Sequence, residues 1–300
     1  MYNGMIIVKK EAGFTSNDVV AKMRGICGQR KVGHTGTLDP DARGVLPVCL
    51  GTGTKLCDML ADRDKEYVTE LLLGVTTDTQ DVSGTVLSER ELTASEEEVE
   101  AAVLSFLGAY DQVPPMYSAL KVNGKKLYEL AREGKEVERK ARRVTILEIE
   151  ILKMKLPVVK LRVACTKGTY IRTLCHDIGE KLGCGGTMKS LVRTRVGHFR
   201  IEQARTLSEL QGLKDSGSLE SVLIPTEDAF SECVRLCVPI EAEKYLRNGN
   251  AILAANFAPN AGAPYQDGQR VRMCTADGTF LGLYEYVGAK KTFEPVKMFL

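Results

Sequence analysis

The pattern of hydrophobic and polar residues predicts strands in five parts of residues 1–230. The clearest case is 65–75, where every second residue suits one buried face of a sheet. Short apolar runs at 5–10 and 45–50, and segments rich in β-branched residues at 143–152 and 158–165, are also typical of strands. The pattern therefore predicts a sheet at the centre of the fold.

Segments with helical periodicity lie between and after these predicted strands. Hydrophobic residues recur at helical spacing in 16–27, with Thr15 or Ser16 as its cap, and 95–106 and 170–182 carry helix signals too. Residues 28–44 are rich in glycine, threonine, aspartate and proline, which predicts a loop. Because the order is mixed and long regular βαβ units are absent, we predict an α+β fold with a mixed, mostly antiparallel sheet flanked by helices.

The length of 300 residues suggests one large domain and one small one. We expect the large domain at 1–230. From Val234 onward, short strands alternate with glycine and asparagine turns, which predicts a compact β domain at 234–300. The chain is 44% hydrophobic and 27% charged, which excludes global disorder. No apolar run reaches the roughly 18 residues of a membrane helix, and the short apolar stretch at the N-terminus ends in lysines, so we expect a cytoplasmic protein.

Charge is distributed unevenly, although the net charge is only +2. Segment 75–100 carries −7, whereas 121–143 and 167–205 each carry +5. Two basic blocks in a nearly neutral chain favour a polyanionic partner such as nucleic acid. The alternative is that each block is only the solvated face of a helix.

Cysteine and histidine spacing gives no support for a metal site. The nine cysteines include no CxxC pair, and His34, His176 and His198 are far apart in the sequence. The segment 51–55 resembles only half of a phosphate-binding loop, because Leu56 stands where serine or threonine is required.

The stretch 31–47 is the strongest candidate for chemistry. An isolated Asp39-Pro40 pair usually marks a turn, because aspartate accepts hydrogen bonds from nearby backbone amides. Here the loop is long, charged and leads directly into a predicted core strand. Such loops often carry functional residues on a rigid scaffold.

Four stretches resemble the TruB-type tRNA pseudouridine synthases. They are IIVKKEAGFTSNDVV (6–20), GHTGTLDPDARGVLPVCLGTGTK (33–55), KEYVTELLLGVTTDTQDVSG (65–84) and TKGTYIRTLCHDIGEKLGCGGTMKSLVRTRVGHF (166–199). Their order along the chain makes the resemblance specific. It implies the pseudouridine synthase catalytic fold, followed by a PUA-like RNA-binding domain whose matches are LRNGNAI (246–252) and DGTFLGLYEYV (277–287).

The resemblance also implies roles for individual residues. Asp39 takes the place of the catalytic aspartate, Tyr67 of the tyrosine that stacks on the target base, and Arg172 of the arginine that pairs with the aspartate. Other positions matching substrate contacts are His34, Tyr170, Leu191 and Lys167. The basic segment 121–143 occupies the place of an insertion that grips RNA.

The implied activity is isomerisation of uridine to pseudouridine in the T-loop of tRNA, at position 55. This reaction breaks the N1–C1′ bond and makes a C5–C1′ bond without redox or hydrolysis, so no cofactor or metal is expected, and one nucleophilic carboxylate suffices. Attack by Asp39 at C1′ and attack at C6 both remain open. We further expect a monomer that needs no protein partner.

Two alternatives accompany this interpretation. One is a guide-RNA-dependent, dyskerin-like synthase acting on ribosomal RNA, against which the basic insertion argues. The other is a non-catalytic RNA-binding protein, against which Asp39, Tyr67 and Arg172 argue together. Two of the residues also have two possible roles each. Tyr67 is either an ordinary core tyrosine or the tyrosine that stacks on the target base. His34 either fills the gap that a flipped base leaves or forms a hydrogen bond to a loop carbonyl.

Overall fold

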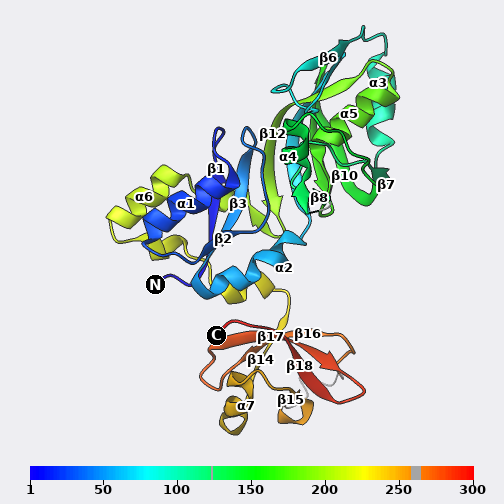
Figure 1. Cartoon of the computed structure of the whole chain (residues 1–300). Helices are drawn as coiled ribbons and strands as arrows, with labels where there is room; N and C mark the ends of the chain where they lie inside the picture. Colours follow the sequence, from blue (N-terminus) through cyan, green and yellow to red (C-terminus); the bar gives the residue numbers. More distant parts are fainter. Residues whose placement is uncertain (123, 258–264) are drawn as a thin grey trace.

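The computed structural model describes residues 1–122, 124–257 and 265–300, and Figure 1 shows their arrangement. Within these residues the chain forms a large mixed sheet covered by helices and a second, smaller sheet. The main path of the large sheet is, in spatial order, β1 (Gly4–Lys10), β3 (Arg43–Leu50), β12 (Gly186–Val196), β4 (Lys65–Leu73), β11 (Val158–Cys165), β10 (Arg142–Lys155) and β7 (Gly108–Gln112), with β2 (Val32–His34) on β3 and β13 (Phe199–Arg200) on β12.

The large sheet is mixed because one strand pair is parallel. Strands β3 and β12 run in the same direction, and the other pairs of this sheet are antiparallel. This confirms the predicted α+β class with a mixed, mostly antiparallel sheet. Strand β4 shows the predicted alternation, because Lys65, Tyr67, Thr69, Leu71 and Leu73 are its buried residues.

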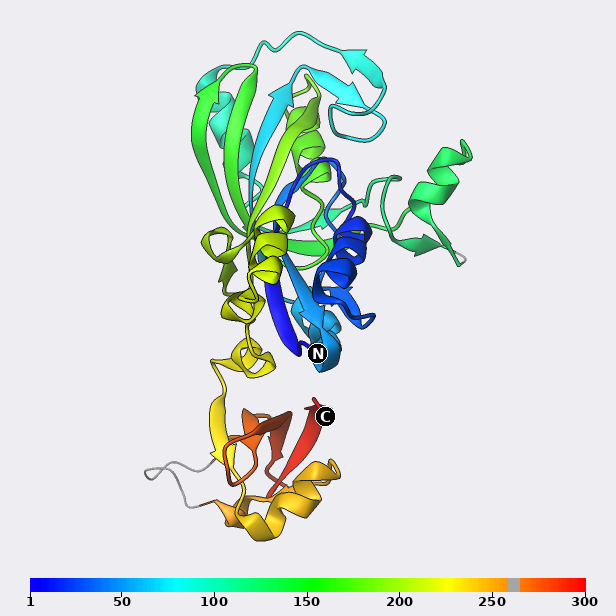
Figure 2. The ribbon, with the colours of Figure 1, turned by 90° about the vertical axis from the view of Figure 1, so that its left-hand side faces the viewer.

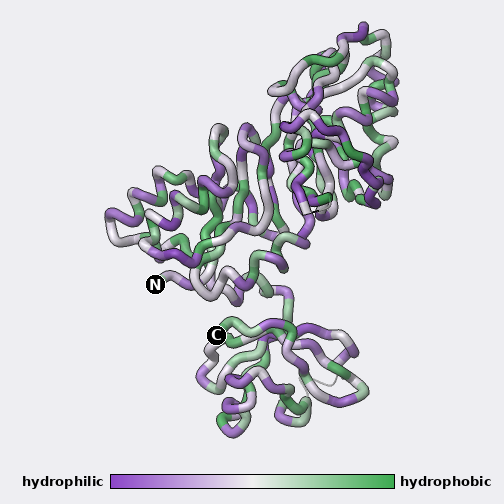
Figure 3. The backbone as a smooth tube through the Cα atoms, viewed as in Figure 1, coloured by the Kyte–Doolittle hydropathy of each residue, from purple (hydrophilic) through white to green (hydrophobic). Residues whose placement is uncertain are grey.

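Helices pack on two halves of this sheet. Helix α1 (Ser16–Cys27) and α6 (Leu207–Asp215) share an apolar cluster with β1 and β3. Helix α3 (Glu96–Leu104) and α5 (Ile171–Lys181) share another with β4, β11 and β12. Figure 3 shows hydrophobic stretches running through the strands of the sheet. Thr15 caps α1 as expected, because its side chain accepts from the amide of Asp18.

The remaining elements of the larger part are short. They are η1 (Gly51–Leu56), α2 (Cys57–Ala61), the hairpin β5 (Val75–Thr77) and β6 (Val86–Glu89), the hairpin β8 (Lys121–Val122) and β9 (Lys125–Lys126), α4 (Leu127–Arg132), η2 (Ile201–Gln203), η3 (Leu219–Val222) and η4 (Thr226–Phe230). Figure 2 shows that the segment around α4, which belongs to the basic insertion, stands out from the body on one side. Residue 123 of this insertion lies outside the described residues.

Residues after Val234 form a five-stranded sheet. Its spatial order is β14 (Val234–Cys237), β16 (Arg270–Cys274), β17 (Phe280–Val287), β18 (Thr292–Met298) and β15 (Ile252–Leu253), accompanied by η5 (Ile240–Ala242), α7 (Glu243–Arg247) and η6 (Ala254–Asn256). A small C-terminal β domain is thereby confirmed. Its PUA-like type and the boundary at 230–234 remain predictions, and 258–264 lie outside the described residues.

The two sheets share apolar contacts. Phe280 of β17 and Phe299, which follows β18, pack against Phe230, with ring centroids 6.2 and 5.8 Å from it. These residues belong to or pack against a cluster that also contains Met5 and Ile7 of β1. The core of the larger part therefore continues into the smaller one.

Sequence patterns did not reveal every strand. Strand β12 lies at the centre of the sheet but carries Lys189, Arg193 and Arg195, and burial of a charged residue such as Arg193 hides the hydrophobic alternation. Strand β2 falls within the loop predicted at 28–44. None of the helices in the described ranges has the length and apolar character needed to cross a membrane.

Candidate active site

Asp39 lies in the loop between β2 and β3, and its neighbours anchor that loop in the core. Leu38 and Ala42 are buried in the cluster that contains Tyr67. The amide of Leu38 donates to Ser16 Oγ of helix α1 at 2.9 Å. The side chain of Asp39 remains 37% exposed. The loop thus presents one carboxylate from a fixed backbone to solvent.

Arg172 meets this carboxylate side-on. Its Nε lies 3.0 Å from Asp39 Oδ2, and its Nη2 donates to Asp39 Oδ1 at 3.1 Å. The arginine side chain is only 6% exposed. Two planar N–H groups facing two carboxylate oxygens form the geometry in which an arginine–carboxylate pair is strongest and best oriented.

The rest of the Arg172 guanidinium is occupied by backbone carbonyls. Nη1 donates to Thr79 O at 3.0 Å and Nη2 to Tyr117 O at 2.8 Å. Asp81 Oδ2 lies 3.8 Å from Nε. With its donors satisfied on several sides, the arginine has little freedom to turn away from Asp39.

The loop that carries Thr79 and Asp81 is fastened to the sheet. Gln80 O accepts from the amide of Met188, and Met188 O accepts from that of Val82, both at 3.0 Å. This loop belongs to a matched motif, but no sequence pattern assigned a role to Thr79 or Asp81. Only the contact with Arg172, 93 residues from Thr79 in the sequence, distinguishes them.

The pKa of the Asp39 carboxyl is raised above its usual value, chiefly by burial and also by Asp81. Arg172 and Lys10 act in the opposite direction and favour the charged form. The site therefore holds a carboxylate whose protonation is sensitive to its cationic neighbours.

Tyr67 and Leu191 line the same core. Both are buried members of the cluster that contains Leu38, and they lie on adjacent strands, β4 and β12. Burial raises the pKa of the Tyr67 phenol, which keeps it neutral at ordinary pH. The structure therefore places a neutral aromatic ring next to the Asp39 loop.

The other predicted site residues have different surroundings. His34 ends β2 and its Nδ1 accepts from the amide of Gly36 at 3.2 Å. Tyr170 precedes α5, and its backbone is bound at both ends by the side-chain amide of Gln112. Lys167 is exposed and pairs with Asp62 at 2.8 Å. Of the predicted site residues, Asp39 and Arg172 are therefore paired directly, and Tyr67 and Leu191 lie in the cluster that contains Leu38. Lys167 lies on the surface.

Two buried cations near the loop had no predicted role. Lys10 Nζ donates to the carbonyls of Pro40 and Ala42 at 2.8 and 2.6 Å, and burial lowers its pKa to about 8. Arg193 binds carbonyls of the same loop from β12. Both lie within the matched sequence stretches, but only the fold shows that they converge on one loop.

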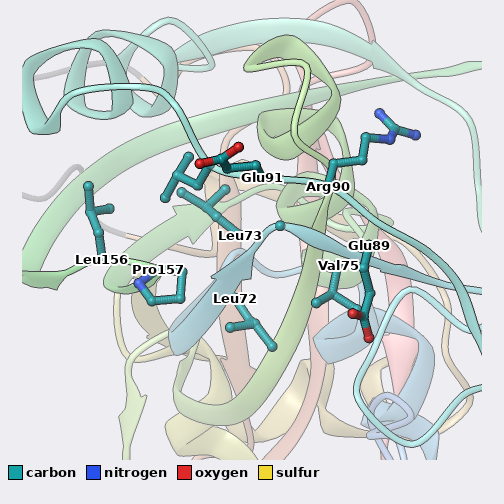
Figure 4. Close-up of a pocket in the computed structure, with 10 residues that line it drawn as sticks. Leu72, Leu73, Val75, Glu89, Arg90, Glu91, Leu156 and Pro157 are labelled. Carbon is teal, nitrogen blue, oxygen red and sulfur yellow. The ribbon is translucent and has the colours of Figure 1, made fainter.

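A separate hollow lies beside the far end of β4. It has a volume of about 620 Å³ and is lined by residues such as Leu72, Arg90 and Pro157 (Figure 4). None of the predicted site residues lines it. We therefore place the candidate chemistry at Asp39 and not in this hollow.

Two family models match the chain in succession. The TruB family pseudouridylate synthase N-terminal domain matches residues 24–171, and the tRNA pseudouridylate synthase B C-terminal domain matches residues 172–231. Asp39 and Tyr67 fall in the first match, and Arg172 is the first residue of the second.

Similar proteins cover nearly the whole chain. Proteins named tRNA pseudouridine synthase B are 50% identical in Lachnoclostridium phytofermentans, over 99% of this chain and all of that protein, and 43% identical in Clostridioides difficile, over 94% and 93%. Among solved structures, a Cbf5-Nop10-Gar1 complex matches with a TM-score of 0.75 at 28% identity, and an H/ACA RNP bound to a substrate RNA with 0.75 at 25%; each match covers 99% of this chain and 85% of the other.

Proposed function

The chain belongs to the TruB family of pseudouridylate synthases and isomerises uridine to pseudouridine in tRNA. From this premise we propose that its target is the T-loop uridine at position 55. We further propose that the reaction needs no cofactor. The N1–C1′ bond breaks, the uracil turns, C5 bonds to C1′ and the proton on C5 is lost, while N1 gains a proton. Electrons and atoms balance without an external reactant.

We propose Asp39 as the nucleophile, attacking either C1′ or C6. The observation that carries this assignment is the side-on ion pair with a nearly inaccessible Arg172, which leaves the carboxylate itself partly exposed. A paired arginine favours the charged form that a nucleophile requires. Because Arg172 is held by further carbonyls, it can orient the carboxylate without leaving its own place.

We assign the surrounding residues to substrate contact. Tyr67 would stack on the target base, with Leu191 beside it in the same buried cluster. His34 would occupy the space that the flipped base leaves. Tyr170, next to Arg172, and the exposed Lys167 would contact the RNA backbone or loop.

The rest of the molecule would hold the RNA. The basic insertion 121–143 and the PUA-like residues 234–300 would grip the tRNA from outside the catalytic loop. We propose that the protein works as a cytoplasmic monomer with no protein partner.

The guide-dependent alternative has one observation in its favour, since the two solved structures described above are an H/ACA RNP and a Cbf5-Nop10-Gar1 complex. The distinguishing experiment supplies an unmodified tRNA transcript to the pure protein and maps pseudouridine. Product at position 55 without guide RNA or a second protein supports our proposal. Product only after addition of a guide complex would support the alternative.

The nucleophile is tested with matched variants. Asp39→Asn keeps the side-chain shape but removes the carboxylate, so turnover should vanish while tRNA still binds. Asp41→Asn is the control, because Asp41 is an exposed aspartate two residues further along the same loop. A near-normal single-turnover rate in Asp39→Asn would remove Asp39 from the mechanism.

A further inference from the structure

One buried cation, Arg193, lies where three strands of the large sheet meet. It is 2% exposed, in β12, and its backbone is the partner of Tyr67 in β4 and of Gly44 in β3. Gly44 permits this approach, because a Cβ there would lie 2.1 Å from Arg193 O, and its φ of +108° disfavours other residues. Arg193 is therefore built into the sheet directly under the Asp39 loop.

The guanidinium of Arg193 binds both ends of that loop. Its Nε donates to Val45 O at 2.8 Å, and its Nη2 and Nη1 lie 3.3 and 3.5 Å from Gly36 O and Thr37 O. Gly36 and Thr37 precede Asp39, and Val45 follows it. One rigid side chain thus sets the separation between the start and the end of the loop.

Arg193 also lies beside Tyr67. The two residues are directly opposed on neighbouring antiparallel strands, and both are buried. The charge of the guanidinium lowers the pKa of the Tyr67 phenol, against the larger effect of burial. Arg193 therefore contacts the loop of the proposed nucleophile and lies next to the proposed stacking ring.

Stability alone does not account for a charge at this position. Among the described residues, no carboxylate forms a salt bridge with Arg193, and burial lowers the pKa of its guanidinium. Lys65 and Lys10, the latter also bound to loop carbonyls, are like charges nearby. A buried cation without a counter-ion is costly, because its desolvation is not repaid by attraction to an opposite charge.

We propose that Arg193 is a positioning residue for the isomerisation, which holds the Asp39 loop and the Tyr67 hydroxyl in one fixed arrangement through a single buried guanidinium. It acts through these groups and does not touch the reacting atoms. The proposal rests on the roles proposed above for Asp39 and Tyr67. Displacing a reacting group by about 1 Å can cost about 100-fold in rate even when the change is remote.

The test compares Arg193→Lys with Arg195→Lys. Lysine keeps a positive charge but has no planar fork with which to reach the loop carbonyls and Tyr67 together. Arg195 is the control, because it lies on the same strand but donates to Gly197 O, away from the loop. Single-turnover rates on an unmodified tRNA transcript should fall about 100-fold in Arg193→Lys, with unchanged tRNA affinity, and should stay normal in Arg195→Lys.

A double-mutant cycle separates positioning from general damage. Tyr67→Phe removes the phenol oxygen, whose pKa the charge of Arg193 lowers against the larger effect of burial. If Arg193 acts partly through this oxygen, Arg193→Lys should cost less in the Tyr67→Phe background than in the unsubstituted protein. Reverting position 193 to arginine within each background should restore the rate of that background, which checks that no other change is responsible.

Three outcomes would overturn the proposal. The first is a normal single-turnover rate in Arg193→Lys. The second is a cycle in which the rate losses of Arg193→Lys and Tyr67→Phe simply multiply. The third is loss of folding, seen by circular dichroism, in both Arg193→Lys and Arg193→Gln, which would assign Arg193 a structural role alone. Failure of the underlying function is distinguishable, because Asp39→Asn would then remain active whatever Arg193 does.

Discussion

At Asp39 the protein places a carboxylate that must be charged to react in surroundings that favour its neutral form. Burial and Asp81 raise the pKa of this carboxyl, and Arg172 and Lys10 lower it. The pH at which the proposed reaction loses activity therefore depends on Arg172, because Arg172 acts on the pKa of Asp39. Activity should disappear as the pH falls through the pKa of Asp39, because the protonated acid is not a nucleophile.

Replacing Arg172 should move this loss of activity to higher pH. Arg172→Gln removes the cation that favours the carboxylate, and an opposite charge at this distance lowers a carboxyl pKa by about 1–3. The midpoint of the acid limb in single-turnover rates should therefore rise by about 1–3 pH units. Arg162→Gln is the control, since Arg162 pairs with Glu150 on the exposed face of β10 and β11. An unshifted acid limb would contradict the assigned pairing.

Substitutions of Tyr67 separate its ring from its hydroxyl. Tyr67→Leu should lose base stacking, worth about 1–3 kcal/mol, which is measured as weaker binding of the flipped base and slower turnover. Tyr67→Phe keeps the ring but removes the hydroxyl. If the ring alone matters, phenylalanine should be close to tyrosine in single-turnover rate; an enzyme-bound intermediate that accumulates in Tyr67→Phe would instead show that the hydroxyl assists a later step.

At the level of elements, the sequence predicted the loop that carries Asp39, the strand that carries Tyr67 and the helix that carries Arg172. Period-two alternation placed β4, and the motif order brought the three residues into one hypothesis. The sequence did not predict the contacts of Arg193 and Asp81. Arg193 and Val45 are 148 residues apart, and no local pattern reports a hydrogen bond over such a separation. A charged residue in a strand is also expected to be exposed until the sheet order is known.

The position of α5 depends on a glycine without room for a side chain. A Cβ on Gly179 would lie 2.1 Å from Gly186 N at the start of β12. Because Arg172 lies in the first turn of the same helix, moving α5 would move the partner of Asp39.

Gly179→Ala should therefore destabilise the protein by about 1–3 kcal/mol through overpacking and reduce turnover more than tRNA binding. Gly212→Ala in α6 is a matched control, because nothing lies within 4 Å of the added carbon. That variant should gain up to about 1 kcal/mol from helix propensity. Urea denaturation of both variants measures the contrast, and equal stabilities would show that α5 adjusts freely.

At the scale of the whole molecule, the basic insertion 121–143 adds a second concentration of positive charge to the cations at the catalytic loop. In the basic insertion, Lys121, Lys140 and Arg142 are exposed, and among the described residues they form no salt bridge. Lys125 and Lys135 instead share Glu133. Lys121, Lys140 and Arg142, which no carboxylate neutralises, are therefore candidates for phosphate contacts.

Reversing these three charges to glutamate should weaken tRNA binding and leave the rate at saturating enzyme nearly unchanged. The slope of log affinity against log salt should fall by about one for each phosphate that the protein no longer neutralises. Equilibrium binding over a range of salt concentrations measures this slope. A salt-independent affinity in the unsubstituted protein would exclude an electrostatic grip.

The junction between the two sheets makes a prediction about stability. Phe299→Ala should cost about 3 kcal/mol, because it empties a buried site against Phe230 and Phe280. Leu300→Ala should change little, because Leu300 is exposed. Thermal melting of the two variants tests the contrast, and an equal melting temperature for Phe299→Ala and the unsubstituted protein would show that the sheets are held together elsewhere.

The same junction determines when this part of the core can form during synthesis. The cluster joins Met5 of β1 to Phe299, which is translated much later. At about 5–20 residues per second, Met5 exists for about 15–60 seconds before Phe299 is made. Throughout that interval the apolar residues of β1 in this cluster lack one of their packing partners. A chain cut short before Phe299 would contain every residue of the proposed active site and would still expose an incomplete apolar cluster to solvent.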